Sequence, residues 1–474
     1  MRKSIRLSFF TALFLALVVT AGAQQVTLSK SVQQFVKVDA PVVALTHVRV
    51  IDGTGAPAVD DQTVVIKDGK IESVGTTAPP AGADVLDMSG RTVIPGIVGM
   101  HDHLFYPNGQ GWYPEMGVSF PLLYLGNGVT TIRTTGSVEP YSDLELKAKI
   151  DTGQFPGPHI FATGPYLEGP GSFTPQMHTL RGPADATETV NYWADEGITS
   201  YKAYMHITRA ELKAAADAAH KRGLTITGHL CSVGFREAAD AGIDDLEHGL
   251  VVDTEFLKTK QPDVCPTGAE ADLAKNVDVN GPEVQGLIQY LVSKHVALTS
   301  TLPVFEDFVP NRAPLEPRIL QAMSPHSAVA YLTNRSRIGM NAKSYWPVLF
   351  QKEMDFERSF AKAGGLLLAG CDPTGIGGTL AGFGDQRELE LLVQAGFTPI
   401  EAIRIATHNG AQFLHEDKVF GTIAPGMRAD LVVIRGNPAE KISDIENTEI
   451  VFKDGIGYDS QKLIDAARGL VGIR

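Results

Sequence analysis

The chain has 474 residues, of which 43% are hydrophobic and 20% are charged, a composition that is ordinary for a soluble globular protein. This length exceeds what one small core supports and predicts either one large barrel-like domain with an appendage or two domains. The formal net charge of -13 argues against a nucleic-acid partner, because no basic surface is available to neutralise phosphates.

The first 23 residues predict an export signal. Basic residues among the first six precede an apolar segment of residues 7–20, and Ala21-Gly22-Ala23 then supplies a small-x-small cleavage site. The apolar segment is short for a membrane span, and no cysteine follows the cleavage site to carry a lipid. We therefore expect a signal peptide over residues 1–23, cleavage near Ala23, and a secreted or periplasmic protein without a stable membrane anchor.

Short alternating strands with turn signals occupy residues 42–92, and a similar texture returns over residues 421–455. Asp68-Gly69 separates two of the apolar runs and is typical of a hairpin. Neither end has enough apolar surface for a core of its own. We therefore expect residues 24–92 and 419–474 to form one small β-sandwich that brackets a central domain.

Strands alternate with amphipathic helices between these two ends. The expected strands are residues 93–103, 128–133, 158–163, 200–204, 224–229, 243–248, 296–302 and 365–372. Helices are expected over residues 209–222, 235–241 and 285–294 among others. Repeated strand-helix alternation favours a parallel α/β sheet, and this number of repeats predicts a (β/α)₈ TIM barrel over residues 93–418.

The first expected strand ends in His101-Asp102-His103. Side chains at i and i+2 of a strand share one face, so the two histidines present their imidazoles side by side. A His-x-His pair also occurs by chance, but further metal-ligand residue types end other strands: Lys202, His229, His248 and Asp372. Barrel enzymes place their chemistry at the carboxyl ends of strands, so this convergence predicts a metal site.

These motifs resemble those of the amidohydrolase superfamily, and within it the imidazolonepropionase-like and prolidase-like enzymes. Val93 to His103 resembles the family's strand-one metal motif, and Leu246-Glu247-His248-Gly249 its strand-six signature. The tail over residues 421–434 is a further marker. The chain departs from the family in Gly370-Cys371-Asp372, where relatives often have Gly-Thr-Asp, and in Arg133-Thr134-Thr135-Gly136, where they often have Arg-Asp-x-Gly.

The resemblance implies two divalent metal ions. Zinc suits a histidine-rich ligand set, and manganese and iron are the alternatives. The implied ligands are His101, His103, Lys202, His229, His248 and Asp372. The first two histidines and the aspartate would hold one ion, the last two histidines would hold the second, and the lysine would bridge them as N6-carboxylysine. If the lysine instead forms a structural salt bridge, one ion held by His101, His103, His229 and Asp372 remains workable.

The chemistry expected of this site is attack of metal-activated hydroxide on an amide carbonyl, with Asp372 as the base that takes the water proton. Tyr204 and His206 follow Lys202 at period two, and either could contact the substrate carbonyl if the strand continues. In the alternative, the strand ends at Tyr204 and His206 caps the next loop.

Substrate contacts are expected from the Gly- and Pro-rich loop from Tyr166 to Thr179, which carries His178 and should overhang the barrel mouth. Arg133 is a further candidate, as a partner of a substrate carboxylate or as part of a salt bridge. Residues 253–283 and 304–350 follow strands six and seven, so we expect long loops there that form lids and specificity walls.

Cysteine usage also bears on the compartment. Cys231, Cys265 and Cys371 are an odd number, so at least one is free. Cys231 and Cys265 both follow predicted strands on one face of the barrel, and we expect them to form a disulfide in an oxidising compartment.

The resulting prediction is a secreted metal-dependent amidohydrolase that cleaves an amide C-N bond of a dipeptide or an N-acyl amino acid. The alternative within enzymes is hydrolysis of cyclic amides, lactones or xenobiotic carboxamides at the same site. A third hypothesis is a non-catalytic metal-binding module, which would have no need to keep Asp372. A homo-oligomer is expected, because even-numbered assemblies are common among relatives.

Overall fold

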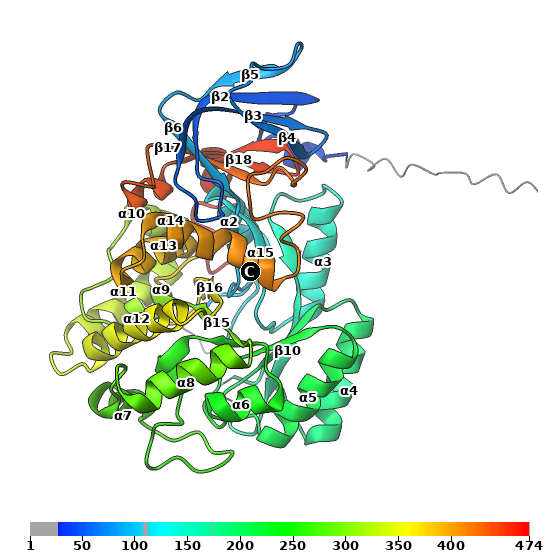
Figure 1. Cartoon of the computed structure of the whole chain (residues 1–474). Coiled ribbons are helices and arrows are strands. Elements are labelled where there is room, and N and C mark those ends of the chain that lie inside the picture. The colour runs from blue at the N-terminus through cyan, green and yellow to red at the C-terminus, as the bar shows by residue number, and fades with distance from the viewer. Residues whose placement is uncertain (1–26, 108–111, 173, 474) are drawn as a thin grey trace, which may run out of the picture.

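The computed structural model describes residues 27–107, 112–172 and 174–473. Figure 1 shows a small sheet at the top of the molecule and a larger α/β part below it. The predicted signal peptide over residues 1–23 lies outside the described residues. No helix among the residues described is both long and apolar enough to cross a membrane.

Two parallel sheets form the larger part. One has the order β11-β10-β12-β13-β14-β15-β16 and the other the order β7-β8-β9. The bounds of these strands are β7 Ile97–Gly99, β8 Val129–Arg133, β9 His159–Phe161, β10 Thr163–Glu168, β11 His178–Thr179, β12 Ser200–Ala203, β13 Thr225–Gly228, β14 Asp245–Glu247, β15 Ala297–Ser300 and β16 Leu367–Ala369. Parallel neighbours need long crossover connections, and helices supply them here.

The helices lie outside these strands. Their bounds are α1 Lys30–Gln33, α2 Ser119–Gly126, α3 Pro140–Asp151, α4 Pro183–Asp195, α5 Arg209–Lys221, α6 Phe235–Ala241, α7 Ala269–Asn276, α8 Pro282–Ser293, α9 Leu302–Glu306, α10 Pro317–Ala322, α11 Pro325–Gly339, α12 Trp346–Lys362, α13 Phe383–Ala395, α14 Pro399–Arg404, α15 Gly410–Phe413 and α16 Ser460–Ala466. In Figure 1, α4, α5, α6 and α8 form a row along the lower edge, each in contact with the next. Their apolar faces cover the strands, most of whose residues are buried.

The predicted parallel α/β architecture is confirmed, and the strands occur in the predicted order. The expected strand over residues 158–163 is divided into β9 and β10, which belong to different sheets. The other edges of the two sheets meet through backbone hydrogen bonds: Met100 N donates to Ala369 O at 2.8 Å, and Cys371 N donates to His101 O at 3.2 Å. Closure into a barrel stays a prediction.

Strands from both ends of the chain form one mixed sheet. Its order is β1-β19-β18-β17-β6-β2-β3-β4, with β5 paired to β2. The bounds are β1 Val36–Val38, β2 Val42–Val50, β3 Val59–Lys67, β4 Lys70–Gly75, β5 Asp84–Asp87, β6 Arg91–Pro95, β17 Leu431–Arg435, β18 Thr448–Lys453 and β19 Ile456–Asp459. The Asp68-Gly69 hairpin is confirmed, since Lys67 pairs with Lys70. The two-layer sandwich stays a prediction, because the strands belong to one connected sheet.

Two expectations about local structure are wrong. The stretch over residues 93–103 is not one strand: β6 ends at Pro95 in the small sheet, and β7 begins at Ile97 in a parallel sheet. The chain passes from one sheet to the other at Gly96. Only glycine fits there, because a Cβ would lie 2.0 Å from Thr130 Oγ1. Residues 253–283 and 304–350 are not loops throughout, because α7 and the run from α9 to α12 lie in them. Both segments do contribute residues to the wall of the cavity described below, as expected.

Candidate metal centre and substrate cavity

The predicted ligand residues converge at the carboxyl ends of the parallel strands. His101 lies two residues beyond β7, and His229 and His248 directly follow β13 and β14. Lys202 lies within β12, and Asp372 comes three residues after β16. All five line one cavity of about 450 Å³, together with His103.

Close distances join these side chains. Asp372 Oδ2 lies 3.7 Å from His101 Nε2 and 3.9 Å from His248 Nε2, and its Oδ1 lies 3.4 Å from His103 Nε2. Lys202 Nζ lies 3.3 Å from His101 Nε2. The ring centroids of His229 and His248 are 4.5 Å apart. Carboxylate and imidazole atoms therefore surround one small volume at the floor of the cavity.

Contacts on the far side of three imidazoles fix which nitrogen faces that volume. His103 Nδ1 donates to the carbonyl of Thr134 at 3.0 Å, and His101 Nδ1 lies 2.6 Å from Glu247 Oε2. His248 Nδ1 lies 2.7 Å from Thr301 Oγ1. In each case Nε2 is left to point inward, which is how proteins orient metal-binding histidines.

The donor set fits a divalent cation. Ligand atoms of His101, His248 and Asp372 all lie within 4.8 Å of one another. His248 Nε2 is buried and has no hydrogen-bond partner, which is costly unless another group satisfies it. Neutral imidazole nitrogens and a carboxylate are the ligand types that zinc takes.

The electrostatics of the site agree with ligand chemistry. Burial, reinforced by Lys202, lowers the pKa of His229 to about 3 and holds that of His101 well below its usual value, so both rings are neutral at pH 7. Burial also lowers the pKa of Lys202 from 10.5 to about 8. Burial alone would raise the pKa of Asp372, but His101 and His103 beside it hold that pKa well below its ordinary value. The floor of the cavity thus offers neutral nitrogens and one carboxylate.

The sequence matches the model of the amidohydrolase family over residues 92–299 and 363–456, which is more than half of the chain. The chain belongs to the amidohydrolase family. The resemblance stated from its sequence motifs is therefore confirmed.

Curated relatives match this amidohydrolase over short segments. The dihydroorotase of Pelotomaculum thermopropionicum is 46% identical over 52 residues, which cover 11% of this chain and 12% of the relative. The imidazolonepropionase of Stenotrophomonas maltophilia is 30% identical over 106 residues, which cover 20% of this chain and 25% of the relative. The chain thus spans a quarter or less of the length of these two relatives.

Solved structures resemble nearly the whole amidohydrolase chain. A candidate prolidase from Bifidobacterium longum is 26% identical with a TM-score of 0.65, over 90% of this chain and 98% of that one. A Xaa-Pro dipeptidase with methionine bound in its active site is 20% identical with a TM-score of 0.66, over 88% of this chain and 100% of that one. The second likeness shows the fold alone.

Two of the five remaining predicted site residues line the amidohydrolase cavity. Tyr204 and Tyr166 do so, with their ring centroids 4.9 Å apart, and Tyr204 also lies 4.8 Å from the ring of His229. The tyrosine that follows β12 thus faces the ligand histidines. The side chain of Tyr166 comes from β10, not from the loop that follows it.

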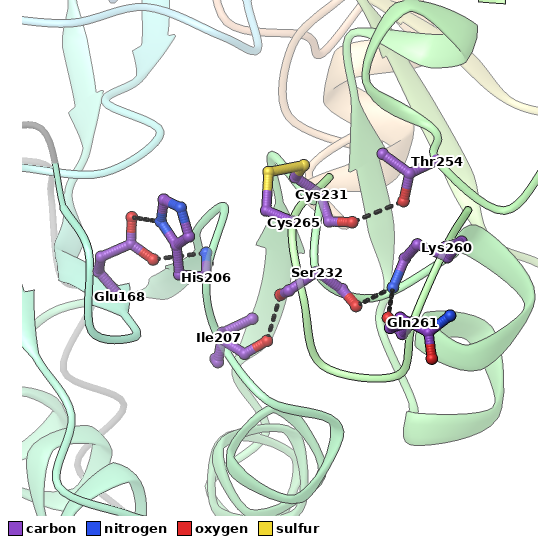
Figure 2. The surroundings of a disulfide bond; sticks show 9 residues. All are labelled: Glu168, His206, Ile207, Cys231, Ser232, Thr254, Lys260, Gln261 and Cys265. Carbon is purple, nitrogen blue, oxygen red and sulfur yellow. Dashed lines mark hydrogen bonds and ion pairs between the residues drawn. A yellow bond between two sulfur atoms is a disulfide. The ribbon is translucent and has the colours of Figure 1, made fainter. Parts of the chain in front are cut away.

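The expectation that His206 faces the substrate is wrong. Strand β12 ends at Ala203, and a turn follows in which Ile207 N donates to Tyr204 O. The period-two argument fails because the strand stops. Figure 2 shows His206 held by Glu168, whose carboxylate accepts from His206 N at 2.7 Å and lies 3.2 Å from its Nδ1. His206 thus caps the loop, as in the alternative.

The substrate roles expected of His178 and Arg133 are also wrong in geometry, since neither is among the described residues that line the cavity. His178 Nε2 lies 3.2 Å from Oγ1 of Thr189, a residue of α4. Arg133 is 1% exposed, and its Nη2 contacts Asp245 at 2.6 Å and Glu247 at 2.9 Å. The salt bridge is therefore the correct alternative, and through Glu247 it supports His101 from below.

The predicted disulfide between Cys231 and Cys265 is confirmed, and Cys371 is free and buried. Figure 2 shows how polar contacts reinforce this bridge beside the cavity. Thr254 Oγ1 donates to Cys231 O at 2.6 Å, and Lys260 Nζ donates to Ser232 O at 2.5 Å. The bridge thus ties the loop after β13 to the segment that carries α7, and both contribute to the cavity wall.

Sequence reasoning missed one group that holds a predicted ligand. His248 has φ 71°, a left-handed conformation that costs energy for a non-glycine residue. Directly behind it, Glu353 of α12 accepts from Val251 N at 2.7 Å, and a Cβ on Gly249 would lie 1.9 Å from Glu353 Oε1. No local pattern points to Glu353, because 102 residues separate it from Val251.

Proposed function

We propose that the protein is a metal-dependent hydrolase that cleaves the amide C-N bond of a small dipeptide-like or N-acyl substrate. The convergence of His101, His103, His248 and Asp372 at the floor of one cavity carries this proposal. Membership of the amidohydrolase family supports it. The candidate prolidase from Bifidobacterium longum, alike over nearly its whole length, supports the choice of a peptide-like amide.

We propose that His101, His103 and Asp372 hold one divalent ion, that His229 and His248 hold a second, and that carboxylated Lys202 bridges them. Carboxylation needs a neutral amine, and the lowered pKa of about 8 makes that form accessible to Lys202 near neutral pH. The carbamate would replace an ammonium beside His101 by an anionic ligand. Zinc is the ion that this ligand set favours.

When bound, divalent ions supply Lewis-acid polarisation of the carbonyl and lower the pKa of the attacking water. Asp372 accepts the proton that water loses as its oxygen adds to the acyl carbon. Thr374 Oγ1 donates to Asp372 Oδ1 at 2.7 Å and so keeps the carboxylate directed at the reacting atoms. The same proton passes from Asp372 to the leaving nitrogen as the C-N bond breaks, which gives an acid and an amine. The hydroxyl of Tyr204 donates to the substrate carbonyl.

Hydrolysis of a cyclic amide is the second candidate function. It is favoured by the matched segments of a dihydroorotase and an imidazolonepropionase, whose names denote ring compounds. Ring and open-chain amides need the same nucleophile and the same proton transfer, so the chemistry of the site does not distinguish the two candidates. Activity trials with both classes of amide do.

We also propose that the strands close into a barrel, supported by the hydrogen bonds that join Met100 to Ala369 and Cys371 to His101. We propose the division into residues 24–92, 93–418 and 419–474, supported by the pairing of β6 with β17. Export to an oxidising compartment is supported by the disulfide between Cys231 and Cys265.

The first experiment combines metal analysis with a substrate panel. The purified protein is stripped with a chelator, reconstituted with zinc, and analysed for metal content and for turnover of dipeptides, N-acyl amino acids and cyclic amides. Two ions per chain with turnover of an open-chain amide support the proposal, whereas turnover of cyclic amides alone moves the function to the second candidate. A fully loaded protein that hydrolyses no amide refutes both.

Lys202→Gln separates bridging from structural roles. The matched control is Lys221→Gln, at the exposed end of α5. We expect two ions per chain in the control and fewer in Lys202→Gln. Equal metal content in both variants contradicts the bridging role.

A further inference from the structure

The cavity above the ligand residues has two walls of different chemistry. The tyrosine wall consists of Phe105, Tyr113, Tyr166 and Tyr204. The tryptophan wall consists of Phe305, Phe308, Tyr345 and Trp346. In the first wall, Tyr166 lies in β10, Tyr204 directly follows β12, and the other two residues lie between β7 and α2. The second wall comes from α9, the residues next to it and the start of α12.

The tryptophan wall is a stack of nearly parallel rings. The ring of Trp346 lies 5.0 Å from that of Phe308, with 20° between the planes, and 5.9 Å from that of Phe305, with 19°. Tyr345 continues the stack at 5.7 Å and 30°. Trp346 and Phe308 are half-buried, so part of the stack is left accessible from the cavity. Such a surface favours another aromatic ring, which gains both apolar burial and ring-ring attraction.

The stack begins next to the ligand residues. Phe305 is 8% exposed, and its ring meets that of His248 edge-on, with 5.4 Å between the centroids. A group attached directly to an amide carbonyl above His248 would therefore lie within reach of the tryptophan wall.

The opposite wall is equipped for the polar part of the same substrate. Its tyrosine hydroxyls are neutral at pH 7, since burial raises the pKa of Tyr113 to about 12 and holds the pKa values of Tyr166 and Tyr204 well above their usual value. Among the described lining residues, Lys202 is the one lysine or arginine, and it lies with the ligands. Arg133 is engaged by Asp245 and Glu247 below. Apart from the ligand residues, the one acidic or basic side chain in the described lining is the carboxylate of Glu270. The walls therefore offer hydroxyls and flat rings, not a cation for a substrate carboxylate.

We propose that the tryptophan wall is an aryl subsite and that the preferred substrate is an amide with an uncharged aromatic ring next to the scissile bond. This inference rests on the proposed amide hydrolysis and deepens it by naming the substrate class. It assigns specificity to Trp346 and Phe308, which touch the substrate ring and take no part in the proton transfer.

Three single-amide substrates test the proposal. N-butyl-phenylacetamide and N-butyl-acetamide differ only in the phenyl ring, and 4-(phenylacetylamino)butanoate has a carboxylate in place of the terminal methyl group of the first. We expect kcat/KM for the aryl amide to exceed that of the acetamide by about 30-fold, which is what burial of one phenyl ring supplies. We expect no gain from the carboxylate. An aryl-to-methyl ratio within twofold, or a carboxylate preference of tenfold, overturns the proposal.

Variants locate the preference. Trp346→Ala should lower the aryl-to-methyl ratio by about tenfold, whereas Trp346→Phe keeps a flat ring and should retain most of it. Trp193→Ala is the matched control, because Trp193 lies on α4, against Tyr141 and Tyr192. If Trp346→Ala does not fold, Trp346→Leu takes its place. A ratio that Trp346→Ala or Trp346→Leu leaves unchanged removes the subsite from this wall.

A binding measurement needs no turnover and separates this inference from the proposed function. Titration calorimetry compares phenylacetamide with acetamide, using zinc-loaded wild-type protein and Trp346→Ala. Tighter binding of phenylacetamide that is lost in Trp346→Ala supports the aryl subsite even if no amide is hydrolysed. Equal affinity of both proteins for phenylacetamide refutes it, even if amides are hydrolysed.

Discussion

The contact between Glu353 and the turn after His248 can be tested with two variants of Glu353 that have side chains of similar size. Burial raises the pKa of Glu353 well above its ordinary value, which favours the uncharged carboxyl. Glu353→Gln has nearly the same shape and keeps an oxygen that accepts from Val251 N. Glu353→Leu fills the same space without an acceptor. The pair thus isolates one hydrogen bond from the packing of α12.

The size of the effect follows from burial. Val251 is 3% exposed and Glu353 is 0% exposed, so water cannot replace the lost acceptor. An orphaned buried N-H costs about 1–3 kcal/mol, which Glu353→Leu should lose from the free energy of unfolding. Without this contact, the backbone at His248 can leave its left-handed conformation. Loss of a supporting contact typically weakens metal affinity by about 10–100-fold. Glu353→Gln should stay within about 0.5 kcal/mol of the wild type.

Two assays check this prediction. Urea unfolding of the metal-free proteins gives the free energies, and competition with a chromophoric chelator gives the zinc affinities. The reasoning is refuted if Glu353→Leu binds zinc as tightly as the wild type, or if Glu353→Gln is as damaged as Glu353→Leu. The second result would mean that the ionised carboxylate, rather than its acceptor oxygen, is what the turn requires.

Further predictions concern the ligands, the salt bridge and the disulfide. Asp372→Asn should lower kcat by about 10²–10⁴-fold without loss of fold, and near-normal kcat would contradict its role as proton acceptor. Because the amine of Lys202, with its pKa of about 8, becomes neutral as the pH rises from 6 to 8, labelled bicarbonate should carboxylate the metal-free protein faster at pH 8, as followed by carbon NMR. Arg133→Met should cost about 3–5 kcal/mol in urea unfolding, because it leaves buried acids unpaired; a substrate role would instead raise KM alone. Replacing Cys231 and Cys265 with Ala opens a loop with a sequence separation of 34, worth about 4 kcal/mol of unfolding free energy in the chain-entropy model, and a loss below about 1 kcal/mol would count against that model here.

The parts of the site that the sequence predicted are those coded by short-range pattern. His101 and His103 are two residues apart after an apolar run, and His229 follows a strand that ends in Gly228. Such signals mark the carboxyl end of a strand, and the parallel sheets preserve those ends. Strand periodicity itself does not reach His101 and His103, because β7 stops at Gly99. The period-two rule likewise fails beyond Ala203, where β12 ends, and there it assigned His206 to the wrong face.

The parts that the sequence did not predict depend on contacts between distant segments. Arg133 carries a charge that either a substrate or an internal acid could balance, and only packing decides that Asp245 and Glu247 balance it. Phe105 lines the cavity but lies beyond the end of β7 at Gly99, so strand periodicity gives no signal for it. The sequence gives no signal for Glu353, because its partner is a backbone N-H, which nearly every residue has.

Helix α12 joins recognition of the substrate to the geometry of the ligands. Trp346 and Glu353 are two helical turns apart and therefore lie on one face, which packs toward the cavity. The first residue forms the tryptophan wall, and the second fixes the backbone beside His248. A shift of α12 large enough to move Trp346 would thus also disturb the turn that presents His248. For the same reason, an aromatic substrate that binds against Trp346 and holds α12 in position would favour the backbone conformation in which His248 Nε2 faces Asp372.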